Sequence, residues 1–216
     1  EFKRPPPVMF SAVRSENAFD LLWPLWTMWG EDVPGASART GGFHDPPWAQ
    51  LLPKMISTAR ENPWGKRTGK KAFWRGAART SALRDSLIAC SKKGQYPVDA
   101  ASVQHKTKTG KPIGALNRAA HRYVVYMDGR TFSSAMLPMI PTGSIVMIPK
   151  SEWITLHSRA FMHSGNYLPF DANPGEVCGN ITSIIKHAEA NVDASSALAS
   201  GAVDWAEANL NIDKVY

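Results

Sequence analysis

The sequence predicts an α/β protein whose second half forms a doubly wound, Rossmann-like parallel sheet. Short runs of β-branched and aromatic residues, typical of strands buried on both faces, alternate there with helical segments. Polar turns with glycine, arginine or hydroxyl side chains follow two of these runs directly. Strands that alternate with helices pair in parallel through right-handed crossovers, so a sheet with helices on both faces is expected.

Length and composition agree with a globular fold. The chain has 216 residues, of which 44% are hydrophobic, enough for one large domain or two small ones. No apolar run reaches the roughly 18 residues that a membrane span needs, so none is expected within the chain. The chain begins at Glu1 without a methionine or signal-like segment, which is typical of a processed protein or a fragment.

The charge balance favours an anionic partner. The formal net charge is +7 and the isoelectric point is near 9.5, which suits nucleic acid, a membrane surface or a phosphorylated small molecule. Positive residues concentrate between Lys66 and Lys111. A solvated basic face explains such a cluster equally well.

Two further features leave alternatives open. Cys90 and Cys178 fit either one structural disulfide or two buried thiols. Asn180 begins an Asn-Ile-Thr triplet that fits a glycosylation acceptor and hints at a secretory route, although such triplets arise often by chance.

The first 65 residues contain one clear helix, over residues 48–60, where apolar residues have helical spacing. Residues 8–10 fit a short strand, and residues 31–47 read as a long loop. Between them lie three tryptophans, Trp23, Trp26 and Trp29. They fit core packing, or an aromatic surface for a sugar or acceptor, because indole offers a flat apolar face and an N–H donor.

Residues 71–89 predict an anion site. Residues 72–74 form an expected strand, and Ser81 is the expected N-cap of a helix that carries Leu83, Leu87 and Ile88 on one side. Unpaired N–H groups and the helix dipole favour a phosphate at such a helix start. Arg75 and Arg79 lie between strand and helix and offer bidentate hydrogen bonds, so the stretch predicts a diphosphate site.

The next unit repeats this order. Residues 123–127 predict a buried strand, followed by a polar turn and a helix over residues 135–140 that ends at Pro141. Asp128, Gly129 and Ser133 lie in this turn; they fit a ligand site or ordinary turn chemistry with serine as the N-cap. Because Arg75, Arg79, Asp128 and Ser133 all follow predicted strand ends, they are expected to converge on one crevice.

The remaining elements complete the sheet. Residues 96–100 and 144–148 predict strands, and residues 106–114 a basic loop. Residues 152–154 are expected to open a helix, and residues 166–170 to form a short or edge strand because of Pro169. Two final helices are expected over residues 174–190 and 194–210, split near Asp193.

The sequence lacks the motifs of several common enzyme and cofactor-binding classes. No P-loop, His-Glu-x-x-His, Cys-x-x-Cys or Gly-x-Ser-x-Gly pattern occurs, and the glycines do not form a dinucleotide fingerprint. His44 with Asp45, and His157 with His163, do not make a convincing metal set, so no metal site is predicted.

Four segments, in order, resemble the family-90 glycosyltransferases, which include protein O-glucosyl- and O-xylosyltransferases and the fungal capsule-associated group. They are DLLWPLWTMW at residues 20–29, FWRG at 73–76 with RTS at 79–81 and RD at 84–85, the strand and turn from Tyr123 to Ser133, and the elements SIV at 144–146, EW at 152–153 and YLPF at 167–170. Each match alone is weak, but their order and spacing are fairly specific.

The resemblance implies a two-domain, GT-B type nucleotide-sugar transferase. Residues 66–216 would form its Rossmann-like UDP-sugar-binding domain, and residues 1–65 part of the acceptor side with a linking helix. The residues implied at the donor are Arg75, Arg79, Thr80, Asp128, Gly129, Arg130, Thr131 and Ser133. Those implied toward the acceptor are Trp26, Thr27 and Trp29.

The resemblance also implies the partners and the compartment. The donor would be a UDP-sugar of glucose or xylose type and the acceptor a protein or glycan hydroxyl, in the lumen of the endoplasmic reticulum or Golgi. No cofactor beyond the donor is implied, no nucleic acid is expected, and dependence on a divalent metal stays open.

The chain departs from the family pattern at three points. The arginine that usually follows the turn serine is missing from residues 134–136, and the family's His-Tyr pair reads Asn166-Tyr167. The family's catalytic aspartate lies upstream of the first matching segment, and no residue before Asp20 can be assigned to it. The chain therefore resembles the C-terminal two-thirds of such an enzyme, with its general base unassigned. A catalytically inactive glycan- or nucleotide-binding domain and a basic nucleic-acid-binding module are the alternatives.

Overall fold

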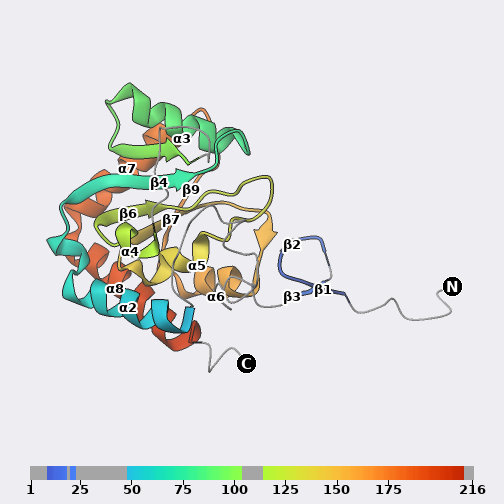
Figure 1. The fold of residues 1–216 in the computed structure, drawn as a ribbon. Helices are drawn as coiled ribbons and strands as arrows, with labels where there is room; N and C mark the ends of the chain where they lie inside the picture. Colours follow the sequence, from blue (N-terminus) through green and yellow to red (C-terminus); the bar gives the residue numbers. More distant parts are fainter. Residues whose placement is uncertain (1–8, 19, 23–47, 104–113, 212–216) are drawn as a thin grey trace, which may run out of the picture.

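The computed structural model describes residues 9–18, 20–22, 48–103 and 114–211. Its centre is a five-stranded parallel sheet in the order β5-β4-β6-β7-β9 (Figure 1). The strands are β4 (Gly69–Gly76), β5 (Val98–Ser102), β6 (His121–Val125), β7 (Ile145–Pro149) and β9 (Leu168–Phe170). The predicted parallel α/β sheet is thus confirmed, with the proline-containing β9 at an edge as expected.

Helices cover both faces of the sheet because side chains alternate along each strand. On one face Tyr123 and Val125 pack against α3 (Ala82–Lys93) and α7 (Val177–Ala190). On the other face Val124 and Tyr126 pack into a cluster with α2 (Trp48–Glu61) and smaller elements. These smaller elements are α4 (Ala115–Arg118), α5 (Met136–Met139), η3 (Ile140–Thr142) and α6 (Leu156–Ser164). The last helix, α8 (Val192–Asn209), contributes to both clusters and lies beside α2 in Figure 1.

A disulfide joins Cys90 of α3 to Cys178 of α7. The sequence left a bridge and two free thiols equally open, and the structure decides for the bridge. The nearby Asn180 lies within α7, and its side-chain nitrogen is buried without a hydrogen-bond partner. A glycosylation acceptor needs an exposed amide, so this residue does not present one in the folded chain.

Two small pairings lie outside the main sheet. β1 (Phe10–Ser11) pairs in parallel with β3 (Leu21–Leu22), and β2 (Arg14–Ser15) pairs antiparallel with β8 (Trp153–Ile154). The expectation that residues 152–154 open a helix is therefore wrong. The helix that follows, α6, begins only at Leu156, after a capping box formed by Thr155 and Ser158.

Helix boundaries also differ from the predictions elsewhere, and α7 begins at Val177 rather than at residue 174. The helix expected to end at Pro141 continues as the 3₁₀ turn η3 through Thr142, since a proline fits the first positions of a helical turn, where its missing N–H is not needed. The last two helices divide at Asn191 rather than near Asp193. The helix expected over residues 48–60 is confirmed as α2.

A buried arginine holds the amino-terminal edge of the sheet. Arg67 is 2% exposed and donates four hydrogen bonds, to the carbonyl oxygens of Asn62, His121 and Thr142 and to the Ser144 hydroxyl. Burial lowers the pKa of Arg67 to about 10. Its partners precede β4, begin β6 and precede β7, so one side chain ties three strands at their start.

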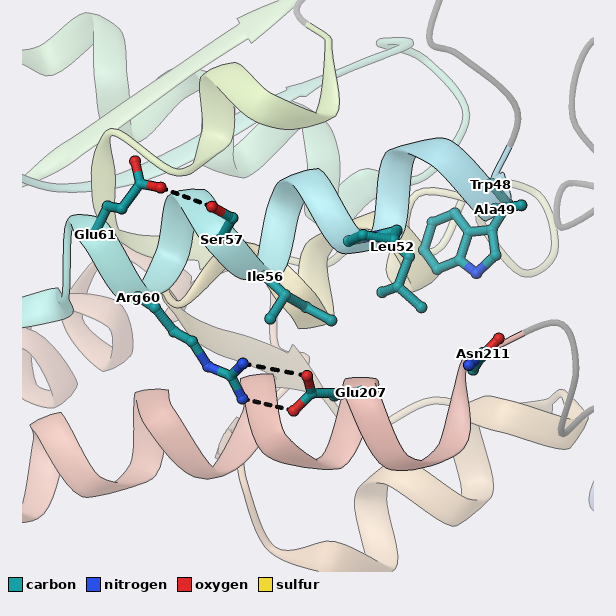
Figure 2. Close-up of a pocket in the computed structure, with 10 residues that line it drawn as sticks. Trp48, Ala49, Leu52, Ile56, Ser57, Arg60, Glu61, Glu207 and Asn211 are labelled. Atoms are coloured by element: carbon teal, nitrogen blue, oxygen red, sulfur yellow. Dashed lines mark hydrogen bonds and ion pairs between the residues drawn. The ribbon is translucent and has the colours of Figure 1, made fainter.

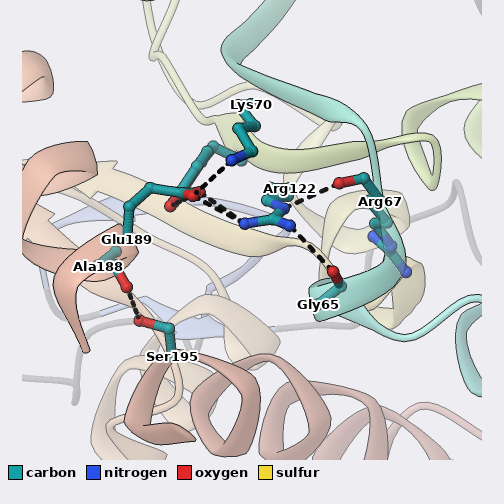
Figure 3. A network of polar contacts seen from close by, with 8 residues as sticks. Gly65, Arg67, Lys70, Arg122, Ala188, Glu189 and Ser195 are labelled. Atoms are coloured by element: carbon teal, nitrogen blue, oxygen red, sulfur yellow. Dashed lines mark hydrogen bonds and ion pairs between the residues drawn. The ribbon is translucent and has the colours of Figure 1, made fainter. Parts of the chain in front are cut away.

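A second polar network lies beside it and ties the same edge to α7 (Figure 3). Arg122 donates to both carboxylate oxygens of Glu189, at 2.9 and 2.8 Å, and to the carbonyl oxygens of Arg67 and Gly65. The Tyr123 hydroxyl also donates to Glu189, at 2.8 Å. Although burial alone would raise it, the pKa of Glu189 is held below its usual range by these hydrogen bonds and the Arg122 charge. Arg67 and Arg122 are thus both engaged by groups of the protein itself.

Within the described ranges, none of the helices combines the length and the apolar character needed to cross a membrane.

Candidate functional site

The order of the strands predicts where a ligand would bind, at the carboxyl ends of β4 and β6. From β4 the chain passes through α3 to β5 on one side, whereas β6 lies on the other side of β4 and leads on to β7. The segments that leave the carboxyl ends of β4 and β6 therefore diverge. In doubly wound sheets ligands bind outside the carboxyl ends of the strands at such a switch point.

The segment after β4 ends in a well-formed helix N-terminus. Ser81 is the N-cap of α3 and accepts a hydrogen bond from the Arg84 backbone N–H, as predicted. Just before it, Arg79 has a φ of 60°, in the left-handed region that non-glycine residues rarely adopt. The backbone N–H of Arg79 donates to the Asp85 carboxylate at 3.0 Å. Its side chain is exposed, and among the described residues its guanidinium makes no hydrogen bond or ion pair.

The segment after β6 folds around a buried tyrosine. The Tyr126 hydroxyl donates to the Asp128 carboxylate at 2.6 Å and accepts from the Ser133 backbone N–H at 3.0 Å. Burial and the neighbouring Asp128 charge raise the pKa of Tyr126, so the hydroxyl stays protonated as a donor. Gly129 donates to the Thr131 carbonyl oxygen, which closes the turn. The turn therefore holds the Asp128 carboxylate in one orientation.

Direct hydrogen bonds join the two segments. The Ser81 hydroxyl donates to the Asp128 carbonyl oxygen at 3.2 Å. The Arg84 guanidinium donates to the Ala77 carbonyl oxygen on one side and to the Met127 carbonyl oxygen on the other, at 3.1 and 2.8 Å. The two segments therefore lie in direct contact. That Arg75, Arg79, Asp128 and Ser133 converge on one crevice and bind a ligand there stays a prediction.

The exposed groups at this edge are the ones suited to a ligand. Besides Arg79, the residues Arg130 and Thr131 are exposed, and Thr80 and Ser133 are partly exposed. The Thr80 hydroxyl already donates to the Ala77 carbonyl oxygen and accepts from Arg84. An incoming anion would thus meet a helix N-terminus and two arginine side chains.

Arg75 lies differently from the prediction. The sequence placed it after a strand, but β4 continues through Gly76, because Gly76 is still in register with Ser102 of β5. The Arg75 guanidinium donates to the Asp99 carboxylate and to the Asp99 carbonyl oxygen, both at 2.8 Å, and stacks over Phe73. Its charge is paired in this structure, in contrast to that of Arg79.

Arg84 is hydrogen-bonded to both segments but is not among the residues that the sequence assigns to the site. Of the three residues expected on the apolar side of α3, Leu87 is fully buried, whereas Leu83 and Ile88 are partly buried. Arg84 and Cys90 are the other buried residues of this helix. The signal for Arg84 was its place three residues after the N-cap and three before Leu87 on the apolar side. The sequence places Arg84 in the Arg-Asp pair of the family-like segment and predicts no role for it.

Other expected site residues lie outside the described residues. These are Trp26, Thr27 and Trp29, expected toward the acceptor. His44, Asp45 and most of the basic loop at residues 106–114, to which the sequence assigned no site, also lie outside the described residues. In the part of the chain that the structure describes, no group of three or more histidine, cysteine, aspartate or glutamate residues could hold a metal ion. His157 and His163 thus form no such group.

Two cavities in the described part of the chain lie away from this site. One, of about 520 Å³, lies between α2 and the end of α8, and Figure 2 shows Trp48, Leu52 and Ile56 along it and the Arg60–Glu207 pair bridging the helices. A second, of about 380 Å³, lies between the start of η2 (Trp64–Lys66) and α8. No residue that the sequence assigned to a site lines either of them.

Comparison with known proteins gives one family and several relatives. The model of glycosyl transferase family 90 matches residues 1–216. Protein O-glucosyltransferase 1 of Homo sapiens is 23% identical over 226 aligned residues, which cover 100% of this chain and 55% of that protein. The Mus musculus and Bos taurus proteins of the same name are 24% and 22% identical, with the same coverage. The chain therefore spans about half the length of the curated relatives it matches.

Proposed function

Because the chain belongs to glycosyl transferase family 90, we propose that it forms the donor-binding part of a transferase that moves a sugar from a UDP-sugar to a hydroxyl group. The acceptor in this proposal is a protein or glycan. Relatives named protein O-glucosyltransferase favour glucose as the sugar and protein as the acceptor. Xylose is the second candidate sugar.

The observation that carries the proposal is the junction of the two segments at the switch point of the sheet. Arg79 projects from a strained backbone beside the N-terminus of α3, and Ser81 ties that N-terminus to the Asp128 turn. A departing UDP develops negative charge on its diphosphate. Arginine side chains and helix N–H groups fixed in advance stabilise such charge in the transition state.

Each residue has a role in this proposal. Arg79, Arg130 and the start of α3 hold the diphosphate; Thr80, Asp128, Gly129, Thr131 and Ser133 enclose the nucleotide and sugar. Arg75 lines the site from β4 while its own charge remains paired with Asp99. The general base that would deprotonate the acceptor hydroxyl is not assigned to any residue of this chain.

The proposed architecture is a GT-B type enzyme. Residues 66–216 form its Rossmann-like donor domain, and residues 1–65 contribute to the acceptor side, with Trp26, Thr27 and Trp29 as acceptor residues. The lumen of the endoplasmic reticulum or Golgi is the proposed compartment. The Cys90–Cys178 disulfide supports it, since such bonds persist in oxidising compartments.

Calorimetric titration with UDP tests the proposal. We expect the wild type to bind UDP with a Kd between micromolar and millimolar. Arg79→Ala should bind about tenfold or more weakly, because hydrogen bonds to charged groups contribute about 1.5–3 kcal/mol. Arg60→Ala is the matched control, since Arg60 is an exposed arginine paired with Glu207 between α2 and α8, and its affinity for UDP should be unchanged. The absence of any UDP heat in wild type would refute the proposal.

Two further measurements separate the alternatives. UDP binding without hydrolysis of UDP-glucose or UDP-xylose would identify a nucleotide-binding domain without transferase activity. Oligonucleotide binding that weakens steeply with salt, in place of UDP binding, would identify a nucleic-acid module.

A further inference from the structure

Asp128 is fixed through its backbone and its side chain, yet part of its carboxylate is free. Its carbonyl oxygen accepts from the Ser81 hydroxyl at 3.2 Å, and its carboxylate oxygen Oδ1 accepts from the Tyr126 hydroxyl at 2.6 Å. Among the described residues, the second oxygen, Oδ2, has no hydrogen-bond or ion-pair partner. Asp128 is only half-buried, and Oδ2 is not shielded from solvent. An oriented acceptor is therefore available at the carboxyl edge of β6.

The turn after β6 does not use this carboxylate to hold its own backbone. An aspartate in a turn commonly accepts from a backbone N–H a few residues ahead. Here the Gly129 N–H donates to the Thr131 carbonyl oxygen at 2.8 Å, and the Ser133 N–H donates to the Tyr126 hydroxyl at 3.0 Å. The turn thus orients the carboxylate without consuming it.

Tyr126 is the side chain that sets this orientation. It is 1% exposed and packs in the core cluster that includes Phe132. Because its hydroxyl oxygen accepts from Ser133, its proton is directed to Asp128. A buried ring with both hydrogen bonds made has no freedom to release the carboxylate.

Charge determines which part of a nucleotide-sugar can meet Asp128. A carboxylate repels phosphate, so the diphosphate belongs with the exposed Arg79 and Arg130 side chains. An ionised carboxylate only accepts hydrogen bonds, so its partner in the ligand must be a donor. The donors of a UDP-sugar are the hydroxyls of ribose and sugar and one N–H of uracil, and only the hydroxyls come in adjacent pairs that match a carboxylate.

We infer that Tyr126 is a positioning residue that presents the Asp128 carboxylate to a pair of adjacent hydroxyl groups of the donor. The inference rests on the proposed function and deepens it, because it assigns the turn after β6 to hydroxyl recognition. Ribose and the transferred sugar both carry such a pair. A carboxylate oriented before the ligand arrives loses little conformational entropy on binding, so its hydrogen bonds contribute fully to selectivity.

Tyr123 provides a matched control. It lies in the same strand β6, is fully buried, and donates from its hydroxyl to the Glu189 carboxylate at 2.8 Å, at the amino-terminal edge of the sheet. Tyr123→Phe and Tyr126→Phe each remove one buried hydrogen bond from a tyrosine to a carboxylate, so both should lower stability. Only Tyr126→Phe should change the selectivity for ligands.

The experiment is a calorimetric titration of wild type, Tyr126→Phe, Asp128→Asn and Tyr123→Phe with UDP, 2′-deoxy-UDP, UDP-glucose and inorganic pyrophosphate. If ribose supplies the hydroxyls, wild type should bind UDP about tenfold or more tightly than 2′-deoxy-UDP, since a hydrogen bond to a charged group is lost. If the sugar supplies them, UDP-glucose should instead bind more tightly than UDP by a similar factor. Tyr126→Phe and Asp128→Asn should reduce this preference to within about threefold. Both should bind pyrophosphate, which carries no sugar, at least as tightly as wild type, and Tyr123→Phe should keep the wild-type preference.

The outcomes are distinguishable. If wild type binds UDP and Tyr126→Phe keeps the same preference, the inference is overturned and the proposed function stands. An equal loss of affinity for all four ligands in Tyr126→Phe would show a purely structural role and would overturn it too, as would wild type without either preference. If wild type binds neither UDP nor pyrophosphate, the inference and the proposed function fall together. Should Tyr126→Phe fail to fold, Asp128→Asn decides, because an unchanged preference in that variant contradicts recognition by the carboxylate.

Discussion

The disulfide allows a quantitative prediction about stability. Reducing the Cys90–Cys178 bond leaves every side chain in place but frees two cysteines that lie 88 residues apart in the chain. The folded state should survive, because Leu87 of α3 and Ile181 of α7 remain packed in the same cluster. The main effect is therefore on the unfolded chain, which gains conformational freedom.

Loop closure sets the size of this effect. For a closed loop of about 88 residues, the chain-entropy relation gives a loss of about 15 cal/mol/K, or about 4.6 kcal/mol at 25 °C. Measured disulfides commonly contribute less, about 2–4 kcal/mol, so a decrease between about 2 and 4.6 kcal/mol in the free energy of unfolding is expected.

Urea unfolding of oxidised and reduced wild type measures this difference. With a urea dependence near the upper end of about 1–3 kcal/mol/M, the midpoint should fall by about 0.7–1.5 M on reduction. Thiol titration confirms the state of the cysteines, and the same reductant added to Cys90→Ala/Cys178→Ala controls for its other effects. A difference below about 1 kcal/mol would show that the bond does not restrain the unfolded chain as argued.

Three other substitutions test local features of the fold. Gly143→Ala should lower the free energy of unfolding by at least about 2 kcal/mol, because φ is +68° and the new Cβ would lie 2.6 Å from an Arg67 nitrogen that has no room to move. Gly201→Ala should instead be neutral or stabilising by up to about 1 kcal/mol, because its new Cβ meets only the end of the Asn166 side chain and alanine favours helix. His157→Gln should flatten the loss of stability in mild acid: burial lowers the pKa of His157, so the unfolded chain takes up its proton first as pH falls below about 6.5.

Urea or thermal unfolding checks each of these. Equal stability of Gly143→Ala and wild type would refute the close packing around Arg67. A large destabilisation by Gly201→Ala would mean that Asn166 cannot move. For His157, wild type should be at full stability above about pH 6.5 and lose it as pH falls toward the lower, folded-state pKa; parallel pH curves for wild type and variant would exclude a role of this side chain.

The fold was largely predictable because local sequence patterns are enough to predict its central strands. The runs at residues 123–127 and 144–148 are apolar on both faces, which only a covered parallel strand requires, and both are strands of the sheet. Ser81 was predictable as an N-cap for the same reason, since its partner is the backbone three residues away. In both cases the residues that determine the element lie within a few positions of it in the sequence.

The errors arose where the partner is distant. Residues Trp153–Ile154 pair with Arg14–Ser15, about 140 positions earlier, and no local pattern reports that pairing. Arg84 was missed for a similar reason, because its acceptors are backbone carbonyl groups, which every residue carries. The sequence alone does not distinguish an arginine that is hydrogen-bonded to backbone carbonyl oxygens from one that is available to a ligand.

Arg67 has a consequence for how the chain comes apart. Its guanidinium is satisfied only while the residues before β4, at the start of β6 and before β7 are all in place. If any one of these segments detaches, the buried Arg67 guanidinium loses a hydrogen-bond acceptor while it is still shielded from water. Partial opening of the central strands therefore has a high free energy relative to complete unfolding. The central strands β4, β6 and β7 should therefore unfold as one cooperative unit, whereas the edge strands β5 and β9 can still open locally.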